Sequence, residues 1–448
     1  QSSISTMVTT DLRRTETAPH SSCLQLIVHE DSDITKVKGT LSGRASVSLK
    51  EVRLDLSQFF RGNKPLKKLR KLFKALGDLP HLKTLRFQYS NSNASVTTTT
   101  GPTRRTTTTA SRGNQQQQQQ QPTLERLPVH LLTIALSQAS GKLETLELNS
   151  VNLTGSEEEF EEFAHLLRNH ASLKVFSFCS SGCSSACSIT QFMEALAESP
   201  KLEKVVIYSE GRSPWGCMTG DAVRALCQSP TLCELQHLVL YNSSSTLGME
   251  NFFTDEHTVA MSKALQQKQK ESQSQSSSQL EEIMISCWPL GNAGVQALCD
   301  MLQVNTTLRK LTMVIYELET PKDNNNNRKP NNRECIIVDL AEALKSNRTL
   351  EVLELHGRSS DGQCGAIEEA FLDTARVNYS LQRIKLFNEY SFIQLDIDFY
   401  LKLNRAGRGK LLQNANATNE QWVQALTNVR NDISCLYYFL SMNPLLVE

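Results

Sequence analysis

The sequence has no excess of charge of either sign and no long apolar run. Lysine plus arginine and aspartate plus glutamate each total 47 residues, so the formal net charge is zero. Because bulk binding to nucleic acid or anionic lipid needs an excess of basic residues, we expect neither partner. No apolar run approaches the roughly 20 residues that a membrane-spanning helix needs. The N-terminal residues also lack the charged, apolar and small-residue succession of a secretory signal.

The motifs of the common enzyme classes are missing as well. The sequence contains no H-E-x-x-H zinc motif, no G-x-x-x-x-G-K-[ST] phosphate loop, no G-x-S-x-G elbow and no dinucleotide-binding glycine pattern. The nine histidines are dispersed, and His237 and His356 fall in or beside predicted strands. Since a lone histidine in a strand is more often a structural or contact residue than a base, we predict no catalytic residue, no cofactor and no enzymatic activity.

Cysteine is present without a framework. The twelve cysteines are scattered, mostly inside apolar patterns where a free thiol behaves as a small hydrophobic residue, as at Cys227, Cys287, Cys299, Cys335 and Cys435. A long chain with its own core needs no disulfide staples, so we expect free thiols and a cytoplasmic protein.

The segment CSSGCSSAC is the nearest approach to a metal motif. Cys179, Cys183 and Cys187 are spaced four residues apart, without the C-x-x-C spacing of a zinc site and without a fourth ligand nearby. We therefore expect a turn rich in serine and glycine, and no metal.

A short pattern recurs along the chain. It consists of an apolar residue, two variable residues, an apolar residue, one variable residue and an apolar residue. It begins ten times, at Leu49, Leu82, Leu143, Leu173, Leu202, Leu235, Leu280, Leu308, Leu350 and Leu381. Six of the nine spacings fall between 28 and 33 residues, and each longer spacing contains a polar tract rich in Thr, Gln, Ser or Asn. Such tracts have little to bury, so we predict disordered inserts near 91–122, 266–279 and 321–332.

Helical patterns fill the space between these short segments. Apolar residues recur three and four positions apart, which predicts a helix with one buried face in each unit. The basic segment KPLKKLRKLFKAL, with cations from Lys64 to Lys74, follows the same pattern. A solvated helix back explains its lysines most simply, and contact with an acidic partner is the alternative. Five N-x-[ST] triplets also occur, which we expect to be chance matches or structural asparagines rather than glycan acceptors: Asn152, Asn305, Asn347, Asn378 and Asn416.

The unit that begins at Leu280, LEEIMISCWPLGNAGVQALCDMLQVNTTL, resembles a leucine-rich repeat of the ribonuclease-inhibitor type. The resemblance rests on the turn formed by Leu290, Gly291, Gly294 and Val295 and on a helix of the form A-L-x-x-x-L from Ala297. It implies an α/β fold, a curved solenoid with parallel strands on the concave side and helices on the convex side. The family's ladder position after the strand departs from the usual Asn or Cys, with Trp288 and Val151 in two units, so we expect an irregular ladder.

The repeats divide the chain into four parts. We predict a disordered N-terminus at 1–20, a degenerate first repeat or cap at 21–48, the repeat array at 49–390 and a C-terminal helical cap at 391–448. Within the array, one apolar residue of each strand should stack with its equivalents as a buried column.

Alternation along each strand then places the intervening residues on the concave face. This face should be charged at both ends and apolar and aromatic in the middle, which is the composition of a protein interface. We therefore predict a non-enzymatic scaffold that binds a partner protein. A regulatory adaptor, such as a GTPase-activating protein or a ubiquitin-ligase substrate receptor, is the alternative. β-Branched residues may simply suit strands, and an insert folded over the sheet would also explain the pattern. The predicted partner-binding residues are Lys204, Val206, Tyr208, His237, Val239, Tyr241, Glu282 and Met284.

Overall fold

The computed structural model describes much of the predicted repeat region and most of the C-terminal segment. The described residues are 23–27, 50–56, 66–88, 126–139, 141–180, 187–209, 225–226, 229, 232, 234–242, 254–271, 279–287, 290–315, 332–357, 364–386, 392–413 and 417–443. The predicted disordered N-terminus and the predicted insert at 91–122 lie outside them, as does the insert near 321–332 up to residue 331.

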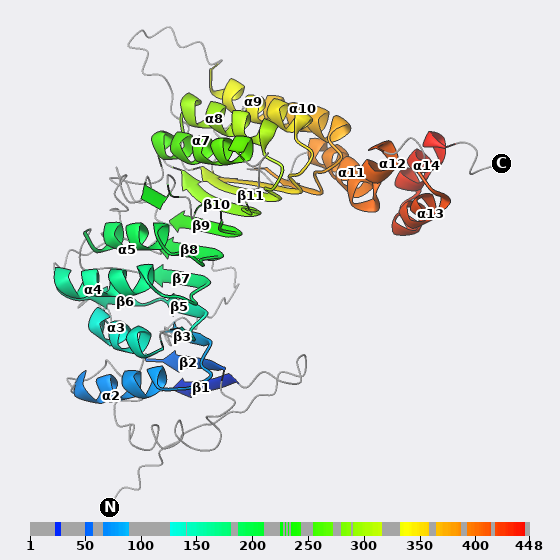
Figure 1. Ribbon diagram of the computed structural model, residues 1–448. Coiled ribbons are helices and arrows are strands. Elements are labelled where there is room, and N and C mark those ends of the chain that lie inside the picture. Colours follow the sequence, from blue (N-terminus) through cyan, green and yellow to red (C-terminus); the bar gives the residue numbers. More distant parts are fainter. Residues whose placement is uncertain are drawn as a thin grey trace, which may run out of the picture.

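Eleven parallel strands form one open sheet (Figure 1). Each strand is hydrogen-bonded to the strand of the next unit along the chain, so the spatial order follows the sequence. A separate parallel pair joins β4 (Arg126–Pro128) to β6 (Asn152–Thr154). The strands of the large sheet are β1 (Cys23–Ile27), β2 (Glu51–Asp55), β3 (Thr84–Gln88), β5 (Thr145–Asn149), β7 (Val175–Ser180), β8 (Lys204–Ser209), β9 (His237–Asn242), β10 (Glu282–Cys287), β11 (Lys310–Ile315), β12 (Val352–Gly357) and β13 (Arg383–Lys385).

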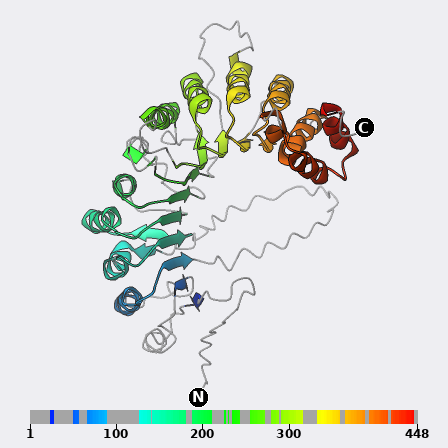
Figure 2. The same ribbon diagram turned by 45° about the vertical axis from the view of Figure 1, so that its right-hand side comes forward.

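Helices cover one face of this sheet and leave the other without helices. In Figure 2 the strands follow the inner side of an arc and the helices its outer side. The helices between strands are α2 (Leu66–Gly77), α3 (Val129–Gln138), α4 (Glu157–Arg168), α5 (Cys187–Ala197), α7 (Asp255–Glu271), α8 (Asn292–Val304), α9 (Asn332–Ser346) and α10 (Cys364–Val377). The chain is therefore an α/β protein built on an open parallel sheet.

The leucine-spaced pattern places one residue of each strand in a common buried column, as predicted. Direct pairing partners follow one another across the sheet, and every member is at most 4% exposed. Parallel in-register stacking thus joins the interior of successive units into one continuous hydrophobic core. The column consists of Val52, Leu85, Leu146, Phe176, Val205, Leu238, Ile283, Leu311, Leu353 and Ile384.

The local sequence signals explain individual helices. Ser156 caps α4, and the side chain of Glu159 accepts a hydrogen bond from the backbone N–H of Ser156, which completes a capping box. In α2 the described lysines and arginine are exposed while Leu69 and Phe73 are buried. This agrees with a solvated helix back. Helix α7 continues to Glu271, so the first six residues of the insert predicted at 266–279 are helical.

Four buried asparagines link the ends of neighbouring helices, and the sequence analysis did not predict this ladder. They are Asn305, Asn347, Asn378 and Asn404, each 6% exposed or less. The side-chain amide of Asn378 donates to the carbonyl oxygens of Leu344 (2.6 Å) and Asn347 (2.8 Å) in the preceding unit. Its Oδ1 accepts from the backbone N–H groups two and three residues further on, at 2.8 and 2.9 Å. The first three belong to N-x-[ST] triplets, and their burial makes them structural residues.

Four helices follow the last strand: α11 (Phe392–Ala406), α12 (Arg408–Gln413), α13 (Asn419–Asn428) and α14 (Ile433–Met442). They form a second, smaller hydrophobic cluster that includes Trp422 and Phe439. Arg408 is 1% exposed and donates to the carbonyl oxygens of Ala375 and Asn378, which ties this helical segment to the end of α10. Among the described residues, no helix has both the length and the apolar character needed to span a bilayer.

Candidate functional site

The helix-free face of the sheet presents one row of side chains from the middle of the strands. These residues pair directly across neighbouring strands, as the alternation predicted. All are exposed or half-buried except Thr312, which is only 2% exposed. The row therefore forms a nearly continuous accessible strip: Arg53, Arg86, Glu147, Ser177, Val206, Val239, Met284, Thr312, Glu354 and Lys385.

The centre of this strip is apolar and aromatic. Val206 pairs with Val239, which pairs with Met284, and all three side chains are half-buried. Two positions further along the strands, the rings of Tyr208 and Tyr241 stack with their centroids 4.6 Å apart and their planes 17° apart. Because the strands are parallel and in register, side chains 33 residues apart in sequence form a single aromatic surface. We call these five residues the central patch.

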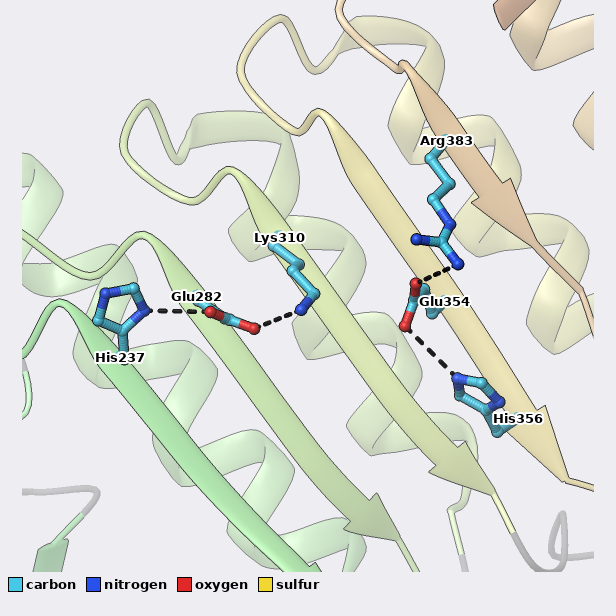
Figure 3. A network of polar contacts seen from close by, with 6 residues as sticks. All are labelled: His237, Glu282, Lys310, Glu354, His356 and Arg383. Atoms are coloured by element: carbon cyan, nitrogen blue, oxygen red, sulfur yellow. Dashed lines mark hydrogen bonds and ion pairs between the residues drawn. The ribbon is translucent and has the colours of Figure 1, made fainter. Parts of the chain in front are cut away.

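The other three predicted residues lie side by side at the beginning of the same strands. Lys204 pairs with His237, which pairs with Glu282. Nδ1 of His237 lies 3.1 Å from Oε2 of Glu282, and Nζ of Lys310 donates to the other carboxylate oxygen at 2.5 Å (Figure 3). Burial by itself would raise the pKa of Glu282, but the hydrogen bonds and charges of Lys310 and His237 outweigh it and lower that pKa.

A second ionic group continues the face beyond the central patch. Oε2 of Glu354 lies 3.5 Å from Nε2 of His356, and Oε1 lies 3.3 Å from a guanidinium nitrogen of Arg383 (Figure 3). The sequence analysis noted His356 as a contact residue and did not include Arg383 or Lys310 in the predicted site. Their strands begin 28 or more residues from those of their partners, so only the register shows that they meet.

The opposite end of the face is also charged. Glu51 accepts from Arg53 at 2.6 Å and lies 3.5 Å from Arg86, which lies 3.0 Å from Glu147. The sheet face thus has an apolar centre between two charged ends, as expected from the sequence. Each exposed ion pair contributes little to stability because water screens it. Their main effect is to set the pattern of charge that an incoming molecule meets.

The cysteine cluster can be placed only in part. Cys179 is a half-buried free thiol at the end of β7, and the side chains of Cys183 and Cys187 lie outside the described residues. In the parts of the chain that the structure describes, no three His, Cys, Asp or Glu residues are grouped so as to hold a metal ion.

Comparison with known proteins identifies no family. No protein-family model matches the chain. No curated protein sequence matches it either. Among solved structures, the leiomodin-1 actin-binding site 2 is similar over 43% of this chain and 94% of its own, with 18% sequence identity and a TM-score of 0.31. A similarity this low assigns neither a fold nor an activity to the chain.

Proposed function

We propose that the chain is a curved leucine-rich repeat solenoid of the ribonuclease-inhibitor type that binds a partner protein on its concave face, without enzymatic activity. The observation that carries this proposal is the central patch. Val206, Val239 and Met284 lie beside the stacked Tyr208–Tyr241 pair on a face that no helix covers.

The chemistry of this face supports recognition rather than catalysis. Tyrosine and methionine are enriched at protein interfaces, and an apolar centre within a polar rim lets water be excluded from the strongest contacts. Glu282 is already neutralised by Lys310 and His237. A partner can therefore approach the patch without burying an uncompensated carboxylate, which would cost binding free energy.

The rest of the chain suits a solenoid. Each unit buries its apolar residues only against its neighbours, so the two end units need covers. Helices α11 to α14 would serve as the C-terminal cap, since they carry a small core of their own beyond the last strand. The buried free thiols of Cys299 and Cys435 fit the cytoplasm, to which we assign the protein.

The proposal can be tested by site-directed photo-crosslinking. A benzophenone amino acid placed at Tyr241 should capture a discrete partner from a cell extract, whereas the same amino acid at exposed Gln296 on α8 should not. After the partner is identified by mass spectrometry and purified, Val206→Asp should weaken binding at least tenfold in calorimetry.

The matched control is Gln296→Asp, which adds a carboxylate to the helix-covered side and should leave binding unchanged. Circular dichroism and thermal unfolding of both variants test whether they remain folded. If folded Val206→Asp binds the purified partner as tightly as the unmodified protein, the central patch is not the binding site.

A further inference from the structure

A groove separate from the central patch lies between the last three units and the C-terminal helices. Its volume is about 710 Å³. One wall comes from the loops that enter β11, β12 and β13, and the other comes from α13. The junction between α11 and α12 forms its end. Hydroxyl, amide and charged groups line most of it, including Thr307, Thr349, Ser380 and Gln424.

The asparagine ladder ends in this groove with an unused acceptor. In Asn305, Asn347 and Asn378, Oδ1 accepts the backbone N–H groups of the residues two and three positions on. Asn404 lines the groove and its amide donates to two carbonyl oxygens of the preceding unit, at 3.0 and 2.6 Å. Its Oδ1, however, has no hydrogen-bond partner among the described residues.

The course of the chain explains this difference. After each earlier ladder asparagine the backbone enters a strand, which brings two N–H groups to the amide oxygen. After Asn404 the chain instead turns at Gly407, whose φ is +111°, and begins α12. Asn404 is 94% buried, since 6% of it is exposed. A buried acceptor without a donor costs about 1–3 kcal/mol, so a ligand N–H placed there would be favoured.

The charged groups of the groove leave an excess of positive charge. Arg309 pairs with Glu351 at 2.6 Å. Arg348, Arg405 and Lys410 also line the groove and have no carboxylate partner within the described part of the chain. The guanidinium of Arg348 lies over the ring of Tyr379, and that of Arg405 donates to a backbone carbonyl, so both are held in place.

We propose that this groove binds an extended acidic peptide segment of a partner protein. Carboxylates of the peptide pair with the three unpaired cations, and one of its backbone N–H groups donates to Oδ1 of Asn404. An inorganic phosphate would satisfy the cations but has no donor for Asn404 in its fully ionised form. An extended peptide supplies both kinds of group at once.

The size of the groove sets the length of the segment. Three neighbouring strands spaced about 4.8 Å apart span about 10 Å, and an extended chain advances about 3.3 Å per residue. The contacts with the three units therefore involve about four residues, with a few more reaching α13. This surface is distinct from the central patch, so its test is independent of the proposed function.

Fluorescence anisotropy of the full chain can test the proposal with defined probes. The probes are labelled, end-blocked octapeptides in which Glu alternates with Gly, Ser or Ala, and the same peptides with Lys in place of Glu. We expect the acidic set alone to bind, and Lys410→Glu to weaken it about five- to tenfold. Lys263→Glu, an equal charge reversal at an exposed position of α7, should leave affinity within about twofold.

Replacing single peptide amides by esters tests the role of Asn404 without altering the protein. One ester position should weaken binding about fivefold, because it removes the N–H that meets Oδ1. Dissociation constants above about 1 mM for every acidic probe would overturn the proposal. So would equal binding of the lysine peptides, equal loss in Lys263→Glu, or full displacement by inorganic phosphate with no ester position having an effect.

Discussion

Removing one rung of the asparagine ladder should destabilise the end of the sheet far more than removing an exposed asparagine. Asn378 is fully buried and makes four side-chain hydrogen bonds to the backbone, each between 2.6 and 2.9 Å. Asn378→Ala removes all four and leaves two carbonyl oxygens and two N–H groups without partners. At about 1 kcal/mol for each, the free energy of unfolding should fall by about 3–5 kcal/mol.

The loss should be local, because each unit of a repeat structure contacts mainly its neighbours. Urea unfolding followed by circular dichroism measures its size. Hydrogen-exchange mass spectrometry measures its position, and peptides from α10 and β13 should lose protection before those from α4 and β5. The distribution of protection matters as much as the midpoint, since such structures need not unfold in a single step.

Asn428 provides the matched control. It is exposed, and its amide donates one long hydrogen bond of 3.3 Å to the carbonyl oxygen of Ala406. Asn428→Ala should lower the free energy of unfolding by less than about 1 kcal/mol. If Asn378→Ala costs no more than Asn428→Ala, the ladder does not hold the units together and the reasoning fails.

Three further predictions follow from local geometry. Gly357→Ala should lower the free energy of unfolding by about 1–3 kcal/mol, because Gly357 has φ +141° and a Cβ there would lie 2.0 Å from a carbonyl oxygen of β11; Gly365→Ala, where nothing lies within 4 Å, should be neutral or stabilising in the same urea assay. Burial lowers the pKa of His170, so the unfolded chain binds a proton more readily than the folded one and stability should fall as pH drops through and below about 6.5; His170→Leu should flatten this dependence, and an unchanged slope would contradict the assignment. Burial also raises the pKa of Cys299 to about 12 and that of Cys435 to about 11, so both thiols should resist alkylation at pH 8 until the chain is unfolded; rapid modification of the native protein would show that they are accessible.

The candidate sites differ in how far sequence alone could reach. The central patch could be predicted because Val206, Val239 and Met284 occupy equivalent positions of a repeated pattern. The ladder had a signal too, since Asn305, Asn347 and Asn378 each stand three residues before the leucine that precedes a strand. The sequence analysis read these asparagines separately and looked for a ladder after the strands instead. Trp288, which stands at that expected position, lies outside the described residues.

Alternating and helical periodicity lies within a few residues, so the sequence by itself determined the order of strands and helices and which side of each strand is buried. The column from Val52 to Ile384 follows from that pattern once parallel units stack in register. Contacts between units depend on the register and on side-chain reach, which no local pattern contains. Only the tertiary structure therefore decided that Lys310 neutralises Glu282, that Thr312 is buried among its neighbours, and that Asn404 keeps an unused acceptor where the chain turns away from the sheet.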